Sequence, residues 1–126
     1  MGRRSFKLAT VALGLRVALI GASGSKPDPD QGRVLFEKRC TGCHALDRSK
    51  AGPPLRGVFG NAAGRNPQYP YSDALKNAHV SWDNSTLDRW LADPEAVVPG
   101  SDMSFRLESA AERADIVAYL KQLGGK

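Results

Sequence analysis

Cysteine occurs only twice in the 126 residues, at Cys40 and Cys43, and His44 follows the second cysteine directly. Two thiols three residues apart lie on one side of a helical turn, so both can add to the vinyl groups on one edge of a porphyrin. The adjacent imidazole of His44 can then bind the iron. The motif Cys40-Thr41-Gly42-Cys43-His44 therefore predicts covalent attachment of one c-type haem.

Paired cysteines of this spacing also occur in zinc sites and in dithiol redox sites. A structural zinc site needs about four ligands, whereas the chain has no third cysteine and only one further histidine, His79. A thioredoxin-type site follows a strand within a βαβ unit, but residues 32–39 have helical character and no strand pattern follows them. The sequence therefore favours haem attachment over both alternatives.

The iron keeps a second axial position after His44. Its candidate ligands are Met103 and His79, and the third possibility is that the position stays open. Met103 is the only methionine besides the initiator, and it follows the irregular segment 99–102. A methionine that merely fills a core lies more often within the apolar stripe of a helix. We therefore expect Met103 to bind the iron and His79 to be a surface residue.

The elements that position these residues are predicted to be short helices joined by long loops. Asp30 is a candidate N-cap for a helix over 31–39, which ends at the cysteine motif. Further helices are expected over 72–78, 84–92, 94–98 and 110–123. Ser109 and Glu112 form a capping box before the last of them. Residues 45–71 are rich in glycine and proline, and a loop of this length is expected to wrap a cofactor rather than pack on itself.

The first 25 residues differ in character from the rest of the chain. Basic residues, among them Arg3 and Arg4, precede an apolar run over 8–20, which is typical of an export signal. We predict that residues 1–25 are this signal and that residues 26–126 form the domain, in the periplasm or otherwise exported. An uncleaved membrane anchor is the alternative, although the run is short for a transmembrane helix.

The net charge of +5 arises mainly from this first segment. Four of the 18 basic residues lie within the first 20 positions, and the other 14 nearly balance the 13 acidic residues. The domain itself is therefore almost neutral. It has no basic stripe of the kind that nucleic-acid binding requires.

Several short motifs follow one another between residues 31 and 123. They are Gly32-x-x-x-Phe36, Cys40-Thr41-Gly42-Cys43-His44, Gly52-Pro53-Pro54-Leu55-x-Gly57, Gly60-x-x-Ala63-Gly64, Tyr71-Ser72-x-Ala74-Leu75, Trp82, Pro99-Gly100-x-x-Met103-x-Phe105 and Ala118-Tyr119-Leu120. Together they resemble class I cytochrome c, of the mitochondrial and bacterial soluble type. The resemblance implies the all-α cytochrome c fold, with three to five short helices and long loops wrapped around one covalently bound haem c.

The resemblance also implies a function and roles for further residues. The protein should carry single electrons and not be an enzyme; a peroxidase-like haem enzyme or a gas-binding haem module with an open distal site is the alternative. Pro53 should accept a hydrogen bond from the Nδ1–H of His44 and so orient the imidazole. Tyr71 and Trp82 should donate hydrogen bonds to a buried haem propionate, and Phe105 should cover the exposed haem edge.

Two packing contacts are implied as well. Gly32 and Phe36 should meet Tyr119 where the first and last helices cross. Trp90 matches the position of an aromatic residue beside the methionine ligand, so it should lie next to Met103.

The expected partners are redox proteins that bind through transient contacts: a membrane oxidase, a quinol-oxidising complex or a soluble dehydrogenase. The mitochondrial protein has lysines around the haem edge, whereas the matching positions here are Glu95, Ala96 and Asp102. Docking to strongly acidic partners is therefore in doubt. We expect a monomer that does not bind nucleic acid, and that associates with membranes only if the signal is uncleaved.

Overall fold

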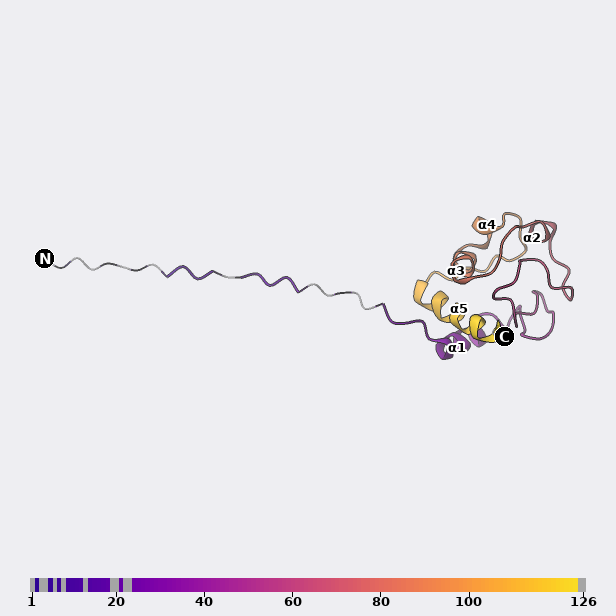
Figure 1. Cartoon of the computed structure of the whole chain (residues 1–126), viewed down its shortest axis with the longest axis horizontal. Helices are drawn as coiled ribbons and strands as arrows, with labels where there is room; N and C mark the ends of the chain where they lie inside the picture. The colour runs from indigo at the N-terminus through magenta and orange to yellow at the C-terminus, as the bar shows by residue number, and fades with distance from the viewer. Residues whose placement is uncertain are drawn as a thin grey trace.

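The computed structural model describes residues 24–124 without a break and, before them, residues 2, 5, 7, 9–12, 14–18 and 21. The helices in chain order are α1 (Pro29–Arg39), α2 (Asp73–Lys76), α3 (Asn84–Ala92), α4 (Pro94–Val97) and α5 (Ala110–Gly124). Figure 1 shows α1 and α5 side by side, with the other helices and the long loops on one side of this pair. The prediction of an all-α fold with three to five short helices is confirmed.

Helix α1 begins earlier than the predicted residue 31, because its N-cap is Asp28 and not Asp30. The Asp28 carboxylate accepts hydrogen bonds from the backbone N–H groups of Asp30 at 2.9 Å and Gln31 at 3.3 Å. Pro29 occupies the first helical position, where its missing N–H costs nothing. The backbone N–H of Asp28 also donates to Asp115 of α5 at 2.8 Å, so the start of α1 is fixed to the last helix.

The crossing of α1 and α5 depends on a glycine. A Cβ at Gly32 would meet the backbone carbonyl of Asp115 and lie 2.9 Å from the Cβ of Tyr119. The rings of Phe36 and Tyr119 pack at a centroid distance of 5.5 Å. The predicted meeting of Gly32 and Phe36 with Tyr119 is therefore confirmed.

Helix α3 has the predicted start and the predicted apolar stripe. Asp83 and Thr86 form a capping box, in which each side chain accepts from the other residue's backbone N–H at 2.8 Å. Leu87, Trp90 and Leu91 are buried on the inner face of the helix. They join a core whose other members are Phe36, Ala63, Trp82, Val98, Leu107, Ile116, Val117, Tyr119 and Leu120.

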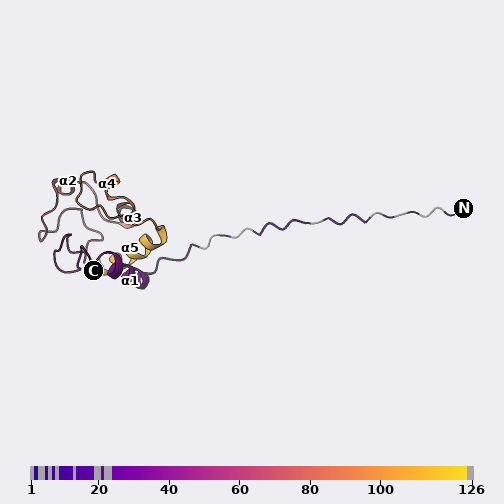
Figure 2. The same cartoon turned by 180° about the vertical axis from the view of Figure 1, so that it is seen from behind.

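The long loop over 45–71 has no helix, as predicted, but it is tied to the rest of the chain by backbone hydrogen bonds. Gly60 donates to Trp82 at 2.7 Å, and Ala63 donates to Val80 at 2.8 Å. An isolated antiparallel bridge joins the same two stretches. Figure 2 shows the domain from behind; the loop also reaches α5, where the Lys121 Nζ lies 5.7 Å from the centroid of the Phe59 ring. The segment before α3 therefore holds the loop in place.

The predicted export signal falls partly on residues 1, 3, 4, 6, 8, 13, 19, 20, 22 and 23, which lie outside the described residues. Of the apolar residues in this stretch that are described, Val11, Leu15 and Val17 are exposed. Within the described ranges, every helix is too short or too polar to cross a membrane. The signal remains a prediction.

Candidate functional site

The residues predicted for the site all line one cavity, whose volume is about 280 Å³. These residues are Cys40, Cys43, His44, Pro53, Tyr71, Trp82, Met103 and Phe105. Much of the remaining wall is apolar, and part of it comes from the core residues Phe36, Ile116 and Leu120. The other candidate ligand, His79, is exposed and is not part of this wall.

The two cysteines lie on a single turn that continues directly from α1. The carbonyl of Cys40 accepts hydrogen bonds from the backbone N–H groups of Cys43 at 3.1 Å and His44 at 2.8 Å. Both thiols are free. Burial, reinforced by the nearby Cys43, raises the pKa of Cys40 to about 11. The turn thus offers two thiols on one side and the imidazole immediately after them.

The imidazole of His44 is held in one orientation and one tautomer. Its Nδ1 lies 2.8 Å from the carbonyl oxygen of Pro53. Because a carbonyl can only accept, Nδ1 carries the proton and Nε2 keeps its lone pair for a metal. Burial lowers the pKa of His44, and the positive charge of Lys50 lowers it further, whereas the hydrogen bond to Pro53 raises it. The ring is therefore neutral near pH 7, as a metal ligand must be.

Gly52 makes room for this imidazole. A Cβ at Gly52 would lie 2.7 Å from Nδ1 and 2.8 Å from Nε2 of His44. The backbone N–H of Gly52 also donates to the carbonyl of Cys43 at 2.7 Å. The loop that carries Pro53 is thereby joined to the cysteine turn, and it packs against the face of the ring.

Met103 contributes a thioether from an irregular segment, as predicted. The indole N–H of Trp90 donates to the Met103 sulfur at 3.2 Å. The ring of Trp90 also packs edge-on against Trp82, with centroids 5.1 Å apart. The expected neighbourhood of Trp90 and Met103 is confirmed, and Phe105 lies partly buried on the same wall.

Tyr71 and Trp82 bring polar groups to an otherwise apolar part of the wall. Burial raises the pKa of Tyr71, an effect that a hydrogen bond with the Asn66 backbone opposes. Trp82 is only 6% exposed, yet none of the hydrogen bonds among the described residues uses its indole N–H. A buried indole usually finds a polar partner, so this donor is suited to a polar group of a bound molecule.

Sequence reasoning missed the role of Ser101 in the site. Its hydroxyl is buried, lines the cavity and has no hydrogen-bond partner among the described residues. Unpaired buried hydroxyls are rare in folded proteins, so this one indicates a polar group of a ligand. A serine after Pro99-Gly100 is also an ordinary turn residue, and nothing in the sequence distinguished the two roles.

The donor set fits a haem. A flat apolar macrocycle suits the apolar wall, and its propionates suit the unpaired hydroxyl of Ser101 and the indole N–H of Trp82, which also lines the cavity. The thiols of Cys40 and Cys43 suit its vinyl groups, and the free Nε2 of His44 suits its iron.

Comparisons with known proteins agree with this chemistry. The family model for cytochrome c matches residues 29–124. Cytochrome c2 of Rhodomicrobium vannielii is 37% identical over 123 residues, which cover 89% of this chain and 98% of the relative. Cytochrome c of Euglena viridis is 39% identical over 99 residues, which cover 76% of this chain and 97% of the relative.

A solved structure gives the same answer for the fold. Cytochrome cH from Methylobacterium extorquens superposes with a TM-score of 0.72 at 40% identity, over 75% of this chain and 98% of that one. A sequence identity of 40% supports common descent as well as a common fold. The chain therefore belongs to the cytochrome c family, as a class I monohaem electron-transfer protein with covalently attached haem c.

Proposed function

We propose that this protein passes single electrons between redox proteins through a haem iron bound by His44 and Met103. The haem supplies the redox chemistry, moving one electron in each ferric–ferrous cycle. A pair of orienting hydrogen bonds supports the choice of ligands. Pro53 accepts the Nδ1 proton of His44, and Trp90 donates to the sulfur of Met103. Each bond leaves one lone pair of the ligand atom free for a metal.

The surroundings of these two ligands suit an electron carrier better than an enzyme. Histidine–methionine ligation favours the ferrous state and raises the reduction potential. The N–H of Trp90 draws electron density from the Met103 sulfur and acts in the same direction. The apolar wall formed by Phe36, Ile116 and Leu120 excludes water. If His44 and Met103 both held the iron, the protein would leave no open position on it for a substrate.

A pair of matched variants tests the ligand set. Met103→Ala should abolish the sulfur-to-iron charge-transfer absorption of the oxidised protein, lower the potential and let the reduced protein bind carbon monoxide. His79→Ala should change none of these, because His79 is exposed and outside the cavity wall. A wild-type protein that lacks the absorption and binds carbon monoxide readily would instead support an open-site haem enzyme or gas-binding module.

The partners we propose are a membrane oxidase, a quinol-oxidising complex or a soluble dehydrogenase, each engaged transiently. Arg39 and Asp102 both line the cavity and are both exposed, so charges of both signs border the site. Such an edge steers partners weakly. Rates of electron exchange should fall only modestly between about 10 and about 200 mM ionic strength, over which the Debye length shrinks from roughly 30 Å to below 10 Å. A hundredfold fall would contradict the mixed edge.

We also propose that residues 1–25 direct export and that the domain works in the periplasm. The basic start and the following apolar run support this assignment. Mass spectrometry of the protein purified from its own cells should find an N-terminus near residue 26. A full-length chain in the membrane fraction would show an uncleaved anchor instead.

A further inference from the structure

The segment that carries Met103 has few backbone hydrogen bonds of its own. Among the described residues, no backbone group of 102–106 enters a hydrogen bond. The segment is held first at its N-terminal end, where the backbone N–H of Gly100 donates to both carboxylate oxygens of Glu95, at 3.1 and 3.0 Å. We call residues 100–107 the methionine strap; its backbone is held by hydrogen bonds only at its two ends, and between them its side chains pack, among them Met103 beside Trp90.

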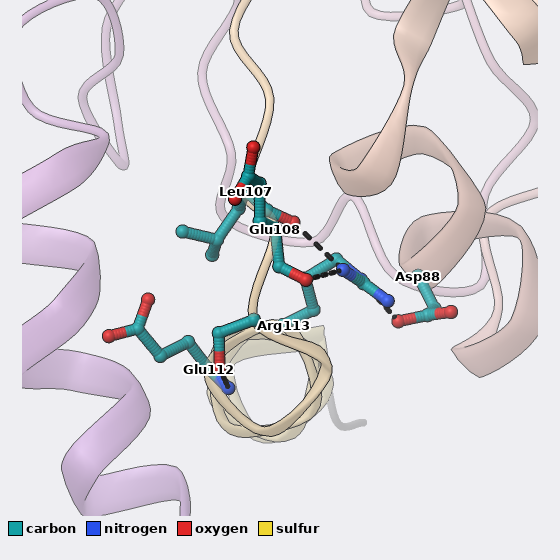
Figure 3. Close-up of polar contacts among 6 residues, drawn as sticks. Asp88, Leu107, Glu108, Glu112 and Arg113 are labelled. Atoms are coloured by element: carbon teal, nitrogen blue, oxygen red, sulfur yellow. Dashed lines mark hydrogen bonds and ion pairs between the residues drawn. The ribbon is translucent and has the colours of Figure 1, made fainter.

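The C-terminal end of the methionine strap is held by Arg113, as Figure 3 shows. The Nη1 of Arg113 donates to the carbonyl oxygens of Leu107 and Glu108, both at 2.8 Å. Its Nε donates to the carboxylate of Asp88 on α3, also at 2.8 Å. The backbone N–H of Leu107 donates in turn to Leu91 at 2.8 Å. One guanidinium from α5 thus joins the strap to two helices.

This anchor is better protected than the other charged contact of the strap. The Arg113 side chain is only 13% exposed although its partner Asp88 is 45% exposed, whereas the arginine of the other pair, Arg106 with Asp93, is 57% exposed. Exposed pairs contribute little because water and salt screen them. Without Arg113, the carbonyls of Leu107 and Glu108 would also lose their charged donor, and hydrogen bonds of that kind are the stronger ones.

We propose that Arg113 is a positioning residue for Met103, acting through the methionine strap by fastening its C-terminal end. The proposal rests on the ligand role given to Met103 above. Asp88 orients the guanidinium, while the two carbonyl bonds do the fastening. Removing the donors should let the strap open more often and release the methionine sulfur from the iron.

Imidazole binding to the oxidised protein measures this opening, because added imidazole can replace Met103 only while the strap is open. Arg113→Met keeps much of the side-chain volume and removes every donor, so imidazole should bind about tenfold more tightly, equivalent to the loss of one charged hydrogen bond (about 1.4 kcal/mol). Asp88→Asn keeps both carbonyl bonds and should change the affinity less than threefold. Arg113→Lys should lie between them and serves if Arg113→Met does not fold.

The matched control is Arg56→Met. Arg56 is also paired with a carboxylate, that of Asp47 at 2.6 Å, but it lies in the 45–71 loop and, among the described residues, makes no hydrogen bond or ion pair with the strap. Its replacement should leave imidazole affinity unchanged. Equal affinities in wild type, Arg56→Met and Arg113→Met would overturn the proposal.

Hydrogen exchange gives a readout that does not depend on the iron ligand. Arg113→Met should speed exchange of the Leu107 amide about tenfold, relative to the Tyr119 amide of α5, which reports global unfolding. Equal acceleration at both amides would show a loss of overall stability and would overturn the specific role of Arg113. If wild type binds imidazole as tightly as Met103→Ala does, the proposed ligand is wrong, and the Leu107 amide still decides whether Arg113 anchors the strap.

Discussion

Replacing Gly52 with alanine tests how closely the chain packs against the imidazole of His44. The new Cβ would overlap most severely with Cε1 of the ring and would lie 2.7 Å from Nδ1, so the ring must retreat by about 1 Å or more to reach an ordinary van der Waals contact. A ring displaced this far would stretch or bend the hydrogen bond from Nδ1 to Pro53, now 2.8 Å, and so weaken it. The same movement would disturb the Nε2 atom that we assign to the iron.

The expected cost follows from these two effects. Overpacking a filled site costs about 1–3 kcal/mol, and weakening one hydrogen bond costs about 0.5–1.5 kcal/mol. A loss of about 2–4 kcal/mol lowers the melting temperature of a domain of this size by about 10 °C or more. Thermal unfolding followed by absorption would measure this shift, and the low-spin spectrum of the oxidised protein would report the state of the histidine.

Gly42→Ala is the matched control, because a Cβ at Gly42 would meet no protein atom within 4 Å. Both changes add one methyl group to the neighbourhood of the cysteine motif. A Gly52→Ala protein with the melting temperature and spectrum of Gly42→Ala would refute the packing argument. It would mean that the loop over 50–53 can move away from the ring at little cost.

Three further predictions follow from the same contacts. Gly32→Ala should lower stability by about 2 kcal/mol or more in urea unfolding, because the α1–α5 crossing must open, while Gly42→Ala, with open space around its Cβ, should not. Trp90→Phe removes the donor to Met103 and should lower the reduction potential in a redox titration; an unchanged potential would mean that this hydrogen bond has no electronic effect. The hydrogen bond from the Thr86 backbone N–H lowers the pKa of Asp83 below its ordinary 3.8. The ionised Asp83 cap therefore stabilises the fold above pH 3.8, and this stabilisation is lost as the pH falls through the lowered pKa of Asp83. The stability difference between wild type and Asp83→Asn should therefore shrink between pH 5 and pH 3, and a constant difference would contradict it.

Much of this architecture could be predicted because local signals agreed with the global fold. The stripe of Leu87, Trp90 and Leu91 identified α3, and the spacing of Cys40, Cys43 and His44 identified the site. The start of α1 was misplaced because Asp28 and Asp30 are both good N-caps, and the choice was made by a distant contact, from Asp28 to Asp115.

The supporting residues could not be predicted for a related reason. In the sequence, Arg113 cannot be told from an ordinary exposed helix residue. Only the fold brings it to the carbonyls of Leu107 and Glu108. Ser101 likewise became notable only once its hydroxyl was found buried without a partner. Local spacing identifies groups that do chemistry, whereas groups that position them depend on contacts between distant segments.

The sharing of residues between core and cavity has a consequence for how cells make this protein. Phe36, Ile116 and Leu120 belong to the core and also face the cavity. A chain that has not received its haem therefore has a void where these side chains should be covered, and voids of that size are costly. We expect such chains to be digested by proteases soon after synthesis. The abundance of the protein should accordingly follow the supply of haem and of the attachment machinery, even when its messenger RNA is plentiful.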